Sequence, residues 1–401
     1  KASSILTSDM KEYIKFITDK RFLIPLAILT VIEIFLQTGV FRPYLKKNSY
    51  ASNINRITDH ILSHKEDHNP DILILGTSVA YQGLSPRILQ NKMDSVGLKV
   101  QSAAVPGSEL IVQELVSEKI LRKFDKVKLL VYVAETTMPW GSQWELGLPT
   151  LAMVGEFDKK DFIPKVGNYG YNVHYDDWVY LMFKSVAYRR DISDLLTDPG
   201  KRMKQISKLL KNPNKNFYDF ENDHFEKVSS YPAETLEECI KKTENFGAPP
   251  YPDNSNPDHK KAVLETCALA KYTRDLINDP HPAKKEQAKK NIELYFQRFR
   301  KVYEHYRKRN IKFLIVFAPY SHLMKDLGGD DKVNVWKQNL EGIIGKENLW
   351  IADMQDAFDG KDSNDFCYDT IHLNHQGMEL FSEKLGNFLL EKENLKRILD
   401  K

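Results

Sequence analysis

Short continuous apolar runs along this chain alternate with longer segments in which apolar residues recur at helical spacing. The short runs predict β-strands, and three of them are almost uninterrupted, as is typical of parallel strands covered by helices on both faces. The predicted strands are Asp71 to Leu75, Leu98 to Val105, Lys128 to Ala134, Lys312 to Ala318 and Leu349 to Ala352.

Two segments have strong helical patterns. In Ala283 to Arg309 one apolar stripe is formed by Ala288, Ile292, Tyr295, Phe296, Phe299, Val302, Tyr303 and Tyr306. The segment His375 to Leu390 repeats this pattern near the C-terminus. The alternation of strands and helices predicts an α/β fold with a doubly wound, mainly parallel sheet of about five strands. We assign this fold to residues 71–395.

The alternation fails between residues 140 and 282. Helical patterns over Asp176 to Leu196 and Lys201 to Lys211 precede a Pro-rich loop, Gly247 to Pro257. We interpret residues 140–282 as one large, mostly helical insertion that lies over the carboxyl edge of the sheet. This position suits a lid or a substrate-binding element, but an insertion that only packs on the domain fits the sequence as well.

Near the N-terminus, Phe22 to Phe41 is mainly apolar and long enough to cross a bilayer, with Glu33 and Gln37 as its only strongly polar members. The stretch ends without a small-residue cleavage pattern, which favours an uncleaved signal anchor over a signal peptide. We therefore expect a membrane anchor at residues 1–41, with a transmembrane helix at about 22–41, and a stalk at 42–70. The alternative is a buried core helix of a soluble protein.

Basic residues flank this stretch almost evenly: Lys11, Lys15, Lys20 and Arg21 before it, and Arg42, Lys46 and Lys47 after it. The slight excess favours an N-terminus in the cytoplasm and a large domain outside it. Because a carboxylate is costly in lipid, we expect Glu33 to face another helix or a polar cavity. A position close to the membrane interface is the alternative.

Composition excludes some functions. The chain of 401 residues has 42% apolar residues, and its 58 basic and 55 acidic residues are mixed throughout, with a net charge of +3. A globular protein without a nucleic-acid-binding surface is therefore expected. Cys239 and Cys267 flank the Pro-rich loop. Two interpretations are open: they form a disulfide in an oxidising compartment, or they are unrelated thiols. Cys367 is expected to be a packing residue.

Two short segments carry candidate chemistry. Ser78 follows the first predicted strand in the sequence DILILGTS, and Asp369 precedes His372 by three residues ahead of a predicted helix. A serine becomes a nucleophile when a histidine takes its proton and a carboxylate orients that histidine. The alternatives are a helix-capping role for Ser78, and a metal-ligand pair or an ordinary turn for Asp369 and His372. His375 is expected to begin the helix.

Together, the strand-Gly-Thr-Ser segment and the pattern DxxH-L-N-x-x-G resemble the SGNH (GDSL-like) hydrolase superfamily. The branch resembled is membrane-anchored and includes the lipoteichoic-acid D-alanylation protein DltD and alginate O-acetylation proteins. The resemblance implies a flavodoxin-like fold, Ser78 as nucleophile, and Asp369 with His372 as the acid–base pair. It also implies an oxyanion hole formed by the Ser78 and Gly107 N–H groups.

The sequence departs from this family at the block that supplies an oxyanion-hole Asn. That block corresponds to Ala134-Glu135-Thr136-Thr137, which contains no Asn. Thr136 is a possible third donor, whereas an ionised Glu135 opposes an oxyanion. The loss of one such donor typically slows catalysis about a hundredfold or more.

The expected function is a serine esterase or O-acyltransferase that acts on O-acyl groups of envelope carbohydrate or lipid, without a metal or cofactor. The resemblance also implies a membrane-bound O-acyltransferase partner and a single-pass protein of the cell (inner) membrane with its catalytic domain on the periplasmic side. The main alternative is a catalytically inactive binding or scaffold protein of a membrane envelope complex. A soluble metalloenzyme is a third and weaker alternative.

Overall fold

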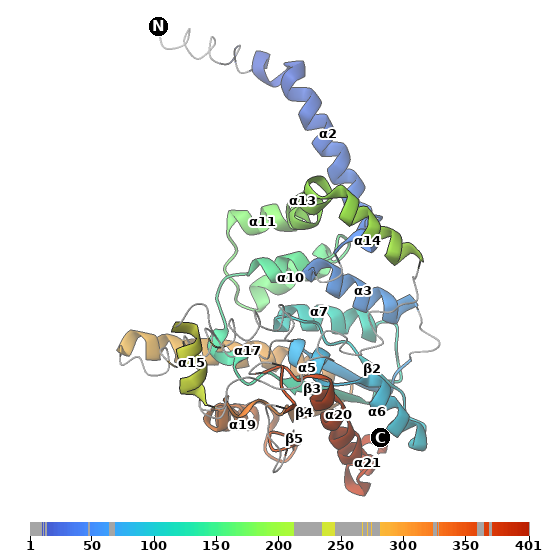
Figure 1. The fold of residues 1–401 in the computed structure, drawn as a ribbon, viewed down its shortest axis with the longest axis vertical. Helices are drawn as coiled ribbons and strands as arrows, with labels where there is room; N and C mark the ends of the chain where they lie inside the picture. The colour runs from blue at the N-terminus through green and yellow to red at the C-terminus, as the bar shows by residue number, and fades with distance from the viewer. Residues whose placement is uncertain are drawn as a thin grey trace.

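Parallel strands form the centre of the protein. The structure is a computed structural model that describes residues 10, 12, 14–46, 49–63, 69–211, 235–244, 267, 271, 274, 281–323, 327, 329–358, 365–368 and 371–400. Its five-stranded sheet has the order β2-β1-β3-β4-β5, and every pairing is parallel (Figure 1). The strands are β1 (Ile72–Gly76), β2 (Val100–Ser102), β3 (Leu129–Ala134), β4 (Lys312–Phe317) and β5 (Ile351–Asp353). The predicted α/β fold is confirmed, and each predicted strand is present.

Helices cover both faces of the sheet because alternate residues of each strand are apolar on opposite faces. Leu73 and Leu75 belong to one hydrophobic cluster, whereas Ile72 and Ile74 belong to another. The first cluster is completed by α3 (Tyr50–Ser63), α7 (Leu110–Leu121), α17 (Pro282–Arg307) and α19 (Gly329–Ile344). The second is completed by α5 (Ser78–Gly83), α6 (Pro86–Met93), α20 (His375–Leu390) and α21 (Lys392–Leu399). The predicted helices at 283–309 and 375–390 correspond to α17 and α20.

The described part of the insertion is helical, as expected, and consists of several short helices. It contains α8 (Met138–Gly141), α9 (Leu148–Met153), α10 (Lys159–Asn168), α11 (Tyr175–Met182), α12 (Lys184–Ala187), α13 (Arg189–Thr197), α14 (Pro199–Lys211) and α15 (Leu236–Glu244). The helical pattern at 176–196 corresponds to α11, α12 and α13, since Phe183 takes an extended conformation and separates α11 from α12. The Pro-rich loop at 247–257 lies outside the described residues.

Helices α9 to α14 form layers outside α3 and α7 (Figure 1). Ion pairs join α7 to the α10 region, including Lys119 with Asp158 at 2.6 Å and Arg122 with Asp161 at 3.1 Å. These helices therefore lengthen one face of the domain. The predicted position of the insertion over the carboxyl edge of the sheet stays a prediction.

The N-terminal apolar stretch forms α2 (Lys20–Gln37), which projects from the rest of the protein (Figure 1). Among the described residues, none of the helices combines the length and the apolar character needed to span a bilayer. The transmembrane prediction for residues 22–41 is thus not supported.

Glu33 attaches the end of α2 to the body of the protein. Its carboxylate accepts hydrogen bonds from the Lys184 N–H at 2.7 Å and the Ser185 N–H at 2.9 Å, at the start of α12. Partial burial favours a higher pKa for Glu33, but hydrogen bonds from Ser185, Lys184 and Gln37 outweigh it, so its pKa is lowered. The expected polar partner of Glu33 is therefore the N-terminus of another helix.

Two of the cysteines form a disulfide, and the third is a thiol. A disulfide joins Cys239, in α15, to Cys267. Cys367 is a fully buried thiol in the second hydrophobic cluster. The pairing that the sequence left open is therefore present, and Cys367 has the packing role that we expected.

The aromatic side chain of Phe299 provides a test of the core. It is fully buried, and its ring centroid lies 5.1 Å from that of Tyr132, 5.6 Å from Trp336 and 5.8 Å from Phe313. Phe299→Ala should lower the free energy of unfolding by about 3–5 kcal/mol, because it leaves a cavity between α17, α19 and the sheet. Urea unfolding of the Leu196→Ala variant, altered at a side chain that is 76% exposed, should stay within about 0.5 kcal/mol of the parent.

Candidate functional site

Ser78 lies where β1 ends and α5 begins. The chain turns at Gly76, which has φ +153°, and a Cβ there would lie 2.8 Å from both the Val133 carbonyl oxygen and the Ala80 Cβ. Only glycine fits this close approach. Thr77 then caps α5 by accepting a hydrogen bond from the Val79 N–H. The turn therefore brings Ser78 to the carboxyl edge of the sheet, as the sequence predicts.

His372 is presented by a folded segment just before α20. Its carbonyl accepts a hydrogen bond from the Tyr368 N–H at 2.8 Å, and the Asn374 N–H donates to the Phe366 carbonyl at 3.0 Å. The Asn374 side chain also caps α20, since its Oδ1 accepts from the Gly377 N–H at 3.0 Å. The two described parts of the segment are thus held together and joined to the start of the helix.

The two candidate residues meet. His372 Nε2 lies 2.8 Å from Ser78 Oγ, within hydrogen-bond distance, although the residues are 294 positions apart. In the neutral imidazole, Nε2 can accept the hydroxyl proton when Nδ1 carries the ring proton. Asp369, the expected orienting acid, lies outside the described residues. Its role therefore stays a prediction.

Gly107 follows β2 beside the end of β1. The Ala103 N–H donates to the Ile74 carbonyl at 2.8 Å, and the Val105 N–H donates to the Gly76 carbonyl at 3.0 Å. These bonds extend the pairing of the two strands up to the turn that carries Ser78. Gly107 has φ +69°, and a Cβ there would approach Tyr50 Cε1 to 2.7 Å. The oxyanion role of the Gly107 N–H stays a prediction.

Glu135 comes directly after β3, the other neighbour of β1. Because Gly76 is in register with Val133, Glu135 is brought to the turn, where its carboxylate accepts a hydrogen bond from the Thr77 hydroxyl. A carboxyl group therefore contacts Thr77, the residue next to the candidate nucleophile. Sequence reasoning identified the opposing charge of Glu135 but missed its contact with Thr77. The position of Thr77 between a strand and a helix was the available signal, since it is a capping position.

Thr136 is buried at the end of β3. Its N–H donates to the Tyr320 hydroxyl at 3.2 Å, and its carbonyl accepts from Trp336 Nε1 at 3.2 Å. The side-chain hydroxyl is buried and has no hydrogen-bond partner among the described residues. These contacts give Thr136 a packing role, and they offer no support for the predicted third oxyanion donor.

A group that has the composition of a metal site lies elsewhere, between α7 and α17. Glu114, Glu118 and His305 each offer a ligand atom within 4.8 Å of one another. Lys165 Nζ already lies 2.7 Å from Glu114 and 2.8 Å from Glu118, so one ammonium group pairs with both carboxylates. Burial, together with the nearby Arg309, lowers the pKa of His305 to about 4. The group is therefore best described as a buried ion pair beside a neutral histidine.

Comparison with known proteins assigns this chain to no family. The chain matches no protein-family profile, and no curated protein is significantly similar to it.

Gly377 tests how the His372 segment is held. A Cβ at this position would lie 2.1 Å from the Phe366 carbonyl oxygen and 3.1 Å from the Leu373 Cβ. Gly377→Ala should therefore separate the segment from α20 and destabilise the protein by about 1–3 kcal/mol in urea unfolding. The control is Gly200→Ala in α14, where a Cβ meets no atom within 4 Å. Equal stability of both variants would contradict the close contact.

Proposed function

We propose that this protein is a serine esterase or O-acyltransferase with Ser78 as its nucleophile. The observation that carries the proposal is the 2.8 Å distance between Ser78 Oγ and His372 Nε2 at the carboxyl edge of a parallel sheet. Ligands of open α/β sheets bind outside this edge, at the point where neighbouring connections diverge. The motifs that resemble the SGNH hydrolases include these same two residues.

In the proposed reaction, Ser78 Oγ attacks the ester carbonyl while His372 Nε2 takes the hydroxyl proton. The carbonyl π electrons move to oxygen, and the resulting oxyanion accepts hydrogen bonds from the Ser78 and Gly107 N–H groups. When the intermediate collapses, His372 returns its proton to the leaving alcohol and an acyl-serine remains. Water or a sugar hydroxyl then attacks this ester, with His372 again acting as the base.

The proposed orienting acid is Asp369. It would accept a hydrogen bond from His372 Nδ1–H and stabilise the imidazolium that forms when Ser78 loses its proton. The substrate class proposed is an O-acylated carbohydrate or lipid of the cell envelope. A membrane-bound O-acyltransferase is the proposed partner. The substrate class and the partner both follow from the family resemblance.

A scaffold protein without catalytic activity is the second candidate. The carboxylate of Glu135, which accepts the hydrogen bond from Thr77, favours it, because a negative charge close to the nucleophile opposes an oxyanion. Labelling by a fluorophosphonate separates the two candidates. A competent serine should react, whereas absence of both labelling and ester turnover would favour the scaffold.

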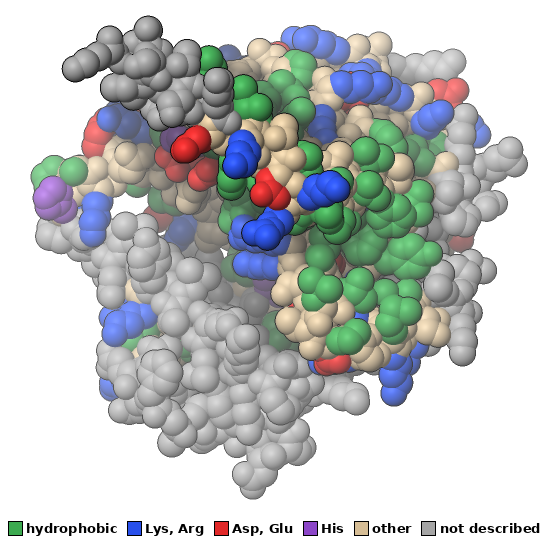
Figure 2. Space-filling model, turned by 90° about the horizontal axis from the view of Figure 1, so that it is seen from above, with side chains coloured by type: hydrophobic (Ala, Val, Ile, Leu, Met, Phe, Trp, Pro, Cys, Tyr) green, Lys and Arg blue, Asp and Glu red, His purple; other side chains and the backbone are tan. Residues whose placement is uncertain are grey.

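Two observations support the proposed location outside the cytoplasm and at a membrane. The disulfide between Cys239 and Cys267 suits an oxidising compartment. Helix α2 exposes apolar side chains all along its projecting part, including Ile28 at 55%, Leu29 at 59% and Val31 at 66%. Figure 2 shows this end of the protein from above, where hydrophobic side chains gather. We propose that α2 inserts this surface into lipid.

Substitution of the nucleophile tests the proposed function. Ser78→Ala should lower the turnover of p-nitrophenyl acetate by the purified protein about a thousandfold or more, because no other group forms the acyl intermediate. The matched control is Ser95→Ala, at an exposed serine whose hydroxyl donates to the Lys92 carbonyl, and it should retain full turnover. Unchanged turnover in Ser78→Ala would sink the assignment.

Charged substitutions in α2 test the membrane proposal. Replacement of Ile28 and Leu29 together by Asp should remove the protein from floated vesicles of phosphatidylethanolamine and phosphatidylglycerol, since buried carboxylates are costly in lipid. The control is Met203→Asp in α14, at a side chain that is 55% exposed. Equal flotation of the parent protein and the Asp variant would contradict a role for α2.

A further inference from the structure

The outer side of α11 is apolar. On its inner side, Leu181 is fully buried in the first hydrophobic cluster, whereas Tyr175, Trp178 and Met182 are exposed. These three positions have the spacing i, i+3 and i+7, so they lie on one face of the helix. Phe183, directly after α11, is exposed as well, and we call these four side chains the α11 face. Folded domains rarely leave such a contiguous apolar face without a partner surface.

Hydrogen bonds join the end of α11 to the end of α2. Gln37, the last residue of α2, donates from Nε2 to the Met182 carbonyl at 2.7 Å. Glu33 accepts from the Lys184 N–H, at the start of α12. Lys159 Nζ donates to Gln37 Oε1 at 2.7 Å and completes the joint. The junction between α11 and α12 is therefore fixed against the last turn of α2.

The place of this junction along α2 sets its depth relative to lipid. The stretch Phe22 to Ile32 has no charged residue and ends directly before Glu33. When this stretch lies in lipid, as proposed above, Glu33 and the start of α12 lie where the acyl chains meet the headgroups, since a helix rises only 1.5 Å per residue. Leu36 is buried in one cluster with Tyr188, which holds the end of α2 on the body. The α11 face is thereby kept at the same boundary, at the end of the body from which α2 projects (Figure 1).

The residue types of the α11 face favour the boundary between lipid and water. Trp and Tyr combine an apolar ring with a polar group, and both are enriched where acyl chains meet headgroups. Met182 and Phe183 add apolar side chains. Arg189 and Arg190, at the start of α13, are exposed, and their charges suit the phosphates of anionic lipid. An aromatic and apolar face beside cationic groups therefore matches an anionic bilayer.

We propose that the α11 face docks on the surface of an anionic bilayer. Helix α2 inserts beside it, and the α11 face enters only the interfacial region, so the body lies against the membrane in one orientation. The helices between α2 and the sheet then hold the Ser78 site at a fixed height above the bilayer (Figure 1). The inference rests on the proposed insertion of α2 and not on the activity of Ser78.

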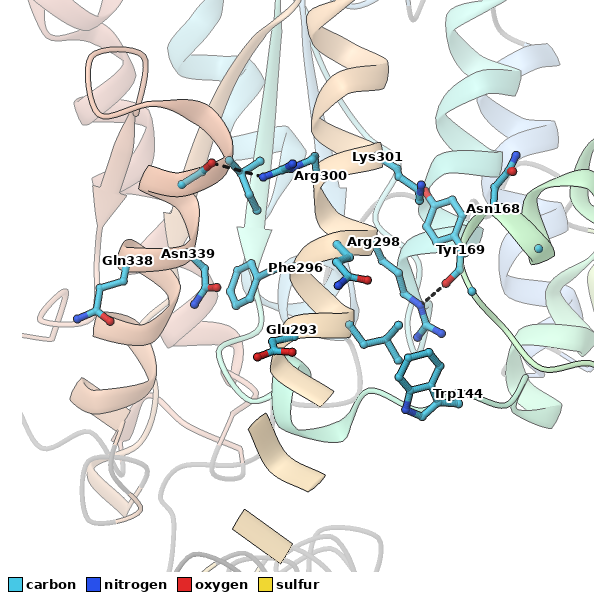
Figure 3. A pocket seen from close by; sticks show the side chains of 16 residues that line it. Trp144, Asn168, Tyr169, Glu293, Phe296, Arg298, Arg300, Lys301, Gln338 and Asn339 are labelled. Atoms are coloured by element: carbon cyan, nitrogen blue, oxygen red, sulfur yellow. Dashed lines mark hydrogen bonds between the residues drawn. The ribbon is translucent and has the colours of Figure 1, made fainter. Parts of the chain in front are cut away.

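Fluorescence quenching by brominated lipid tests the α11 face. Trp178 is 40% exposed, and Trp144, which is 42% exposed, is a matched control because it lies in a groove beside α17, away from α2 (Figure 3). Vesicles of phosphatidylethanolamine and phosphatidylglycerol with bromine near the top of the acyl chains should quench the fluorescence of the full chain. Trp178→Phe should remove most of this quenching, whereas Trp144→Phe should leave the amount of quenched fluorescence unchanged.

A pair of charged substitutions separates docking of the α11 face from insertion of α2. Replacement of Met182 and Phe183 together by Asp should leave the protein on floated vesicles but lower the quenching to that of Trp178→Phe, because carboxylates are costly in lipid. The control is Leu399→Asp, at an exposed side chain of α21, at the opposite end of the body from α2 (Figure 1). It should retain full quenching.

The outcomes distinguish this inference from the proposals on which it rests. Flotation of the parent without quenching of Trp178 would overturn the docking, leave the insertion of α2 standing and indicate a protein partner for the α11 face. Quenching that persists in the Ile28→Asp, Leu29→Asp variant would support the docking and contradict the role of α2. Absence of both flotation and quenching would overturn both. None of these outcomes depends on ester turnover by Ser78.

Discussion

The parallel pairing of β1 with β2 and β3 is the constraint on which the candidate site depends. Because all three strands point the same way, the residues that follow them reach one edge of the sheet. The pairing continues past β1 through the bond from the Val105 N–H to the Gly76 carbonyl, and it aligns Val133 with Gly76. For this reason Glu135 contacts Thr77 beside Ser78, and the segment just before Gly107 is bonded to the same turn. A shift of one residue in either pairing would separate them.

The second half of the site depends on packing. Helix α20 lies on α5 and α6 and contributes Phe381 and Leu385 to the cluster that contains Val79 and Ala80. His372 reaches Ser78 because its segment is attached to the start of this helix through Asn374 and Gly377. The same cluster that stabilises one face of the sheet thus sets the distance between the candidate nucleophile and its base. A mutation in this core would affect chemistry as well as stability.

Glu135 has opposite effects on the stability of the candidate site and on the reaction proposed there. Glu135 accepts from Thr77 and so supports the turn that carries Ser78, yet its charge opposes the anion that an acyl-transfer reaction forms. One residue therefore stabilises the turn, and at a catalytic Ser78 its charge would oppose the reaction.

The sequence by itself determined the strands, the helices α17 and α20, and the two motifs, because apolar periodicity and turn residues are local signals. The tertiary structure decided how they combine. The 2.8 Å approach of His372 to Ser78 depends on register and helix packing over 294 positions, which no local pattern encodes. The apolar stretch at 22–41 predicted a longer helix than the one that forms. Helix α2 ends at Gln37, and hydrogen bonds from Lys184 and Ser185 to Glu33 attach this end to α12.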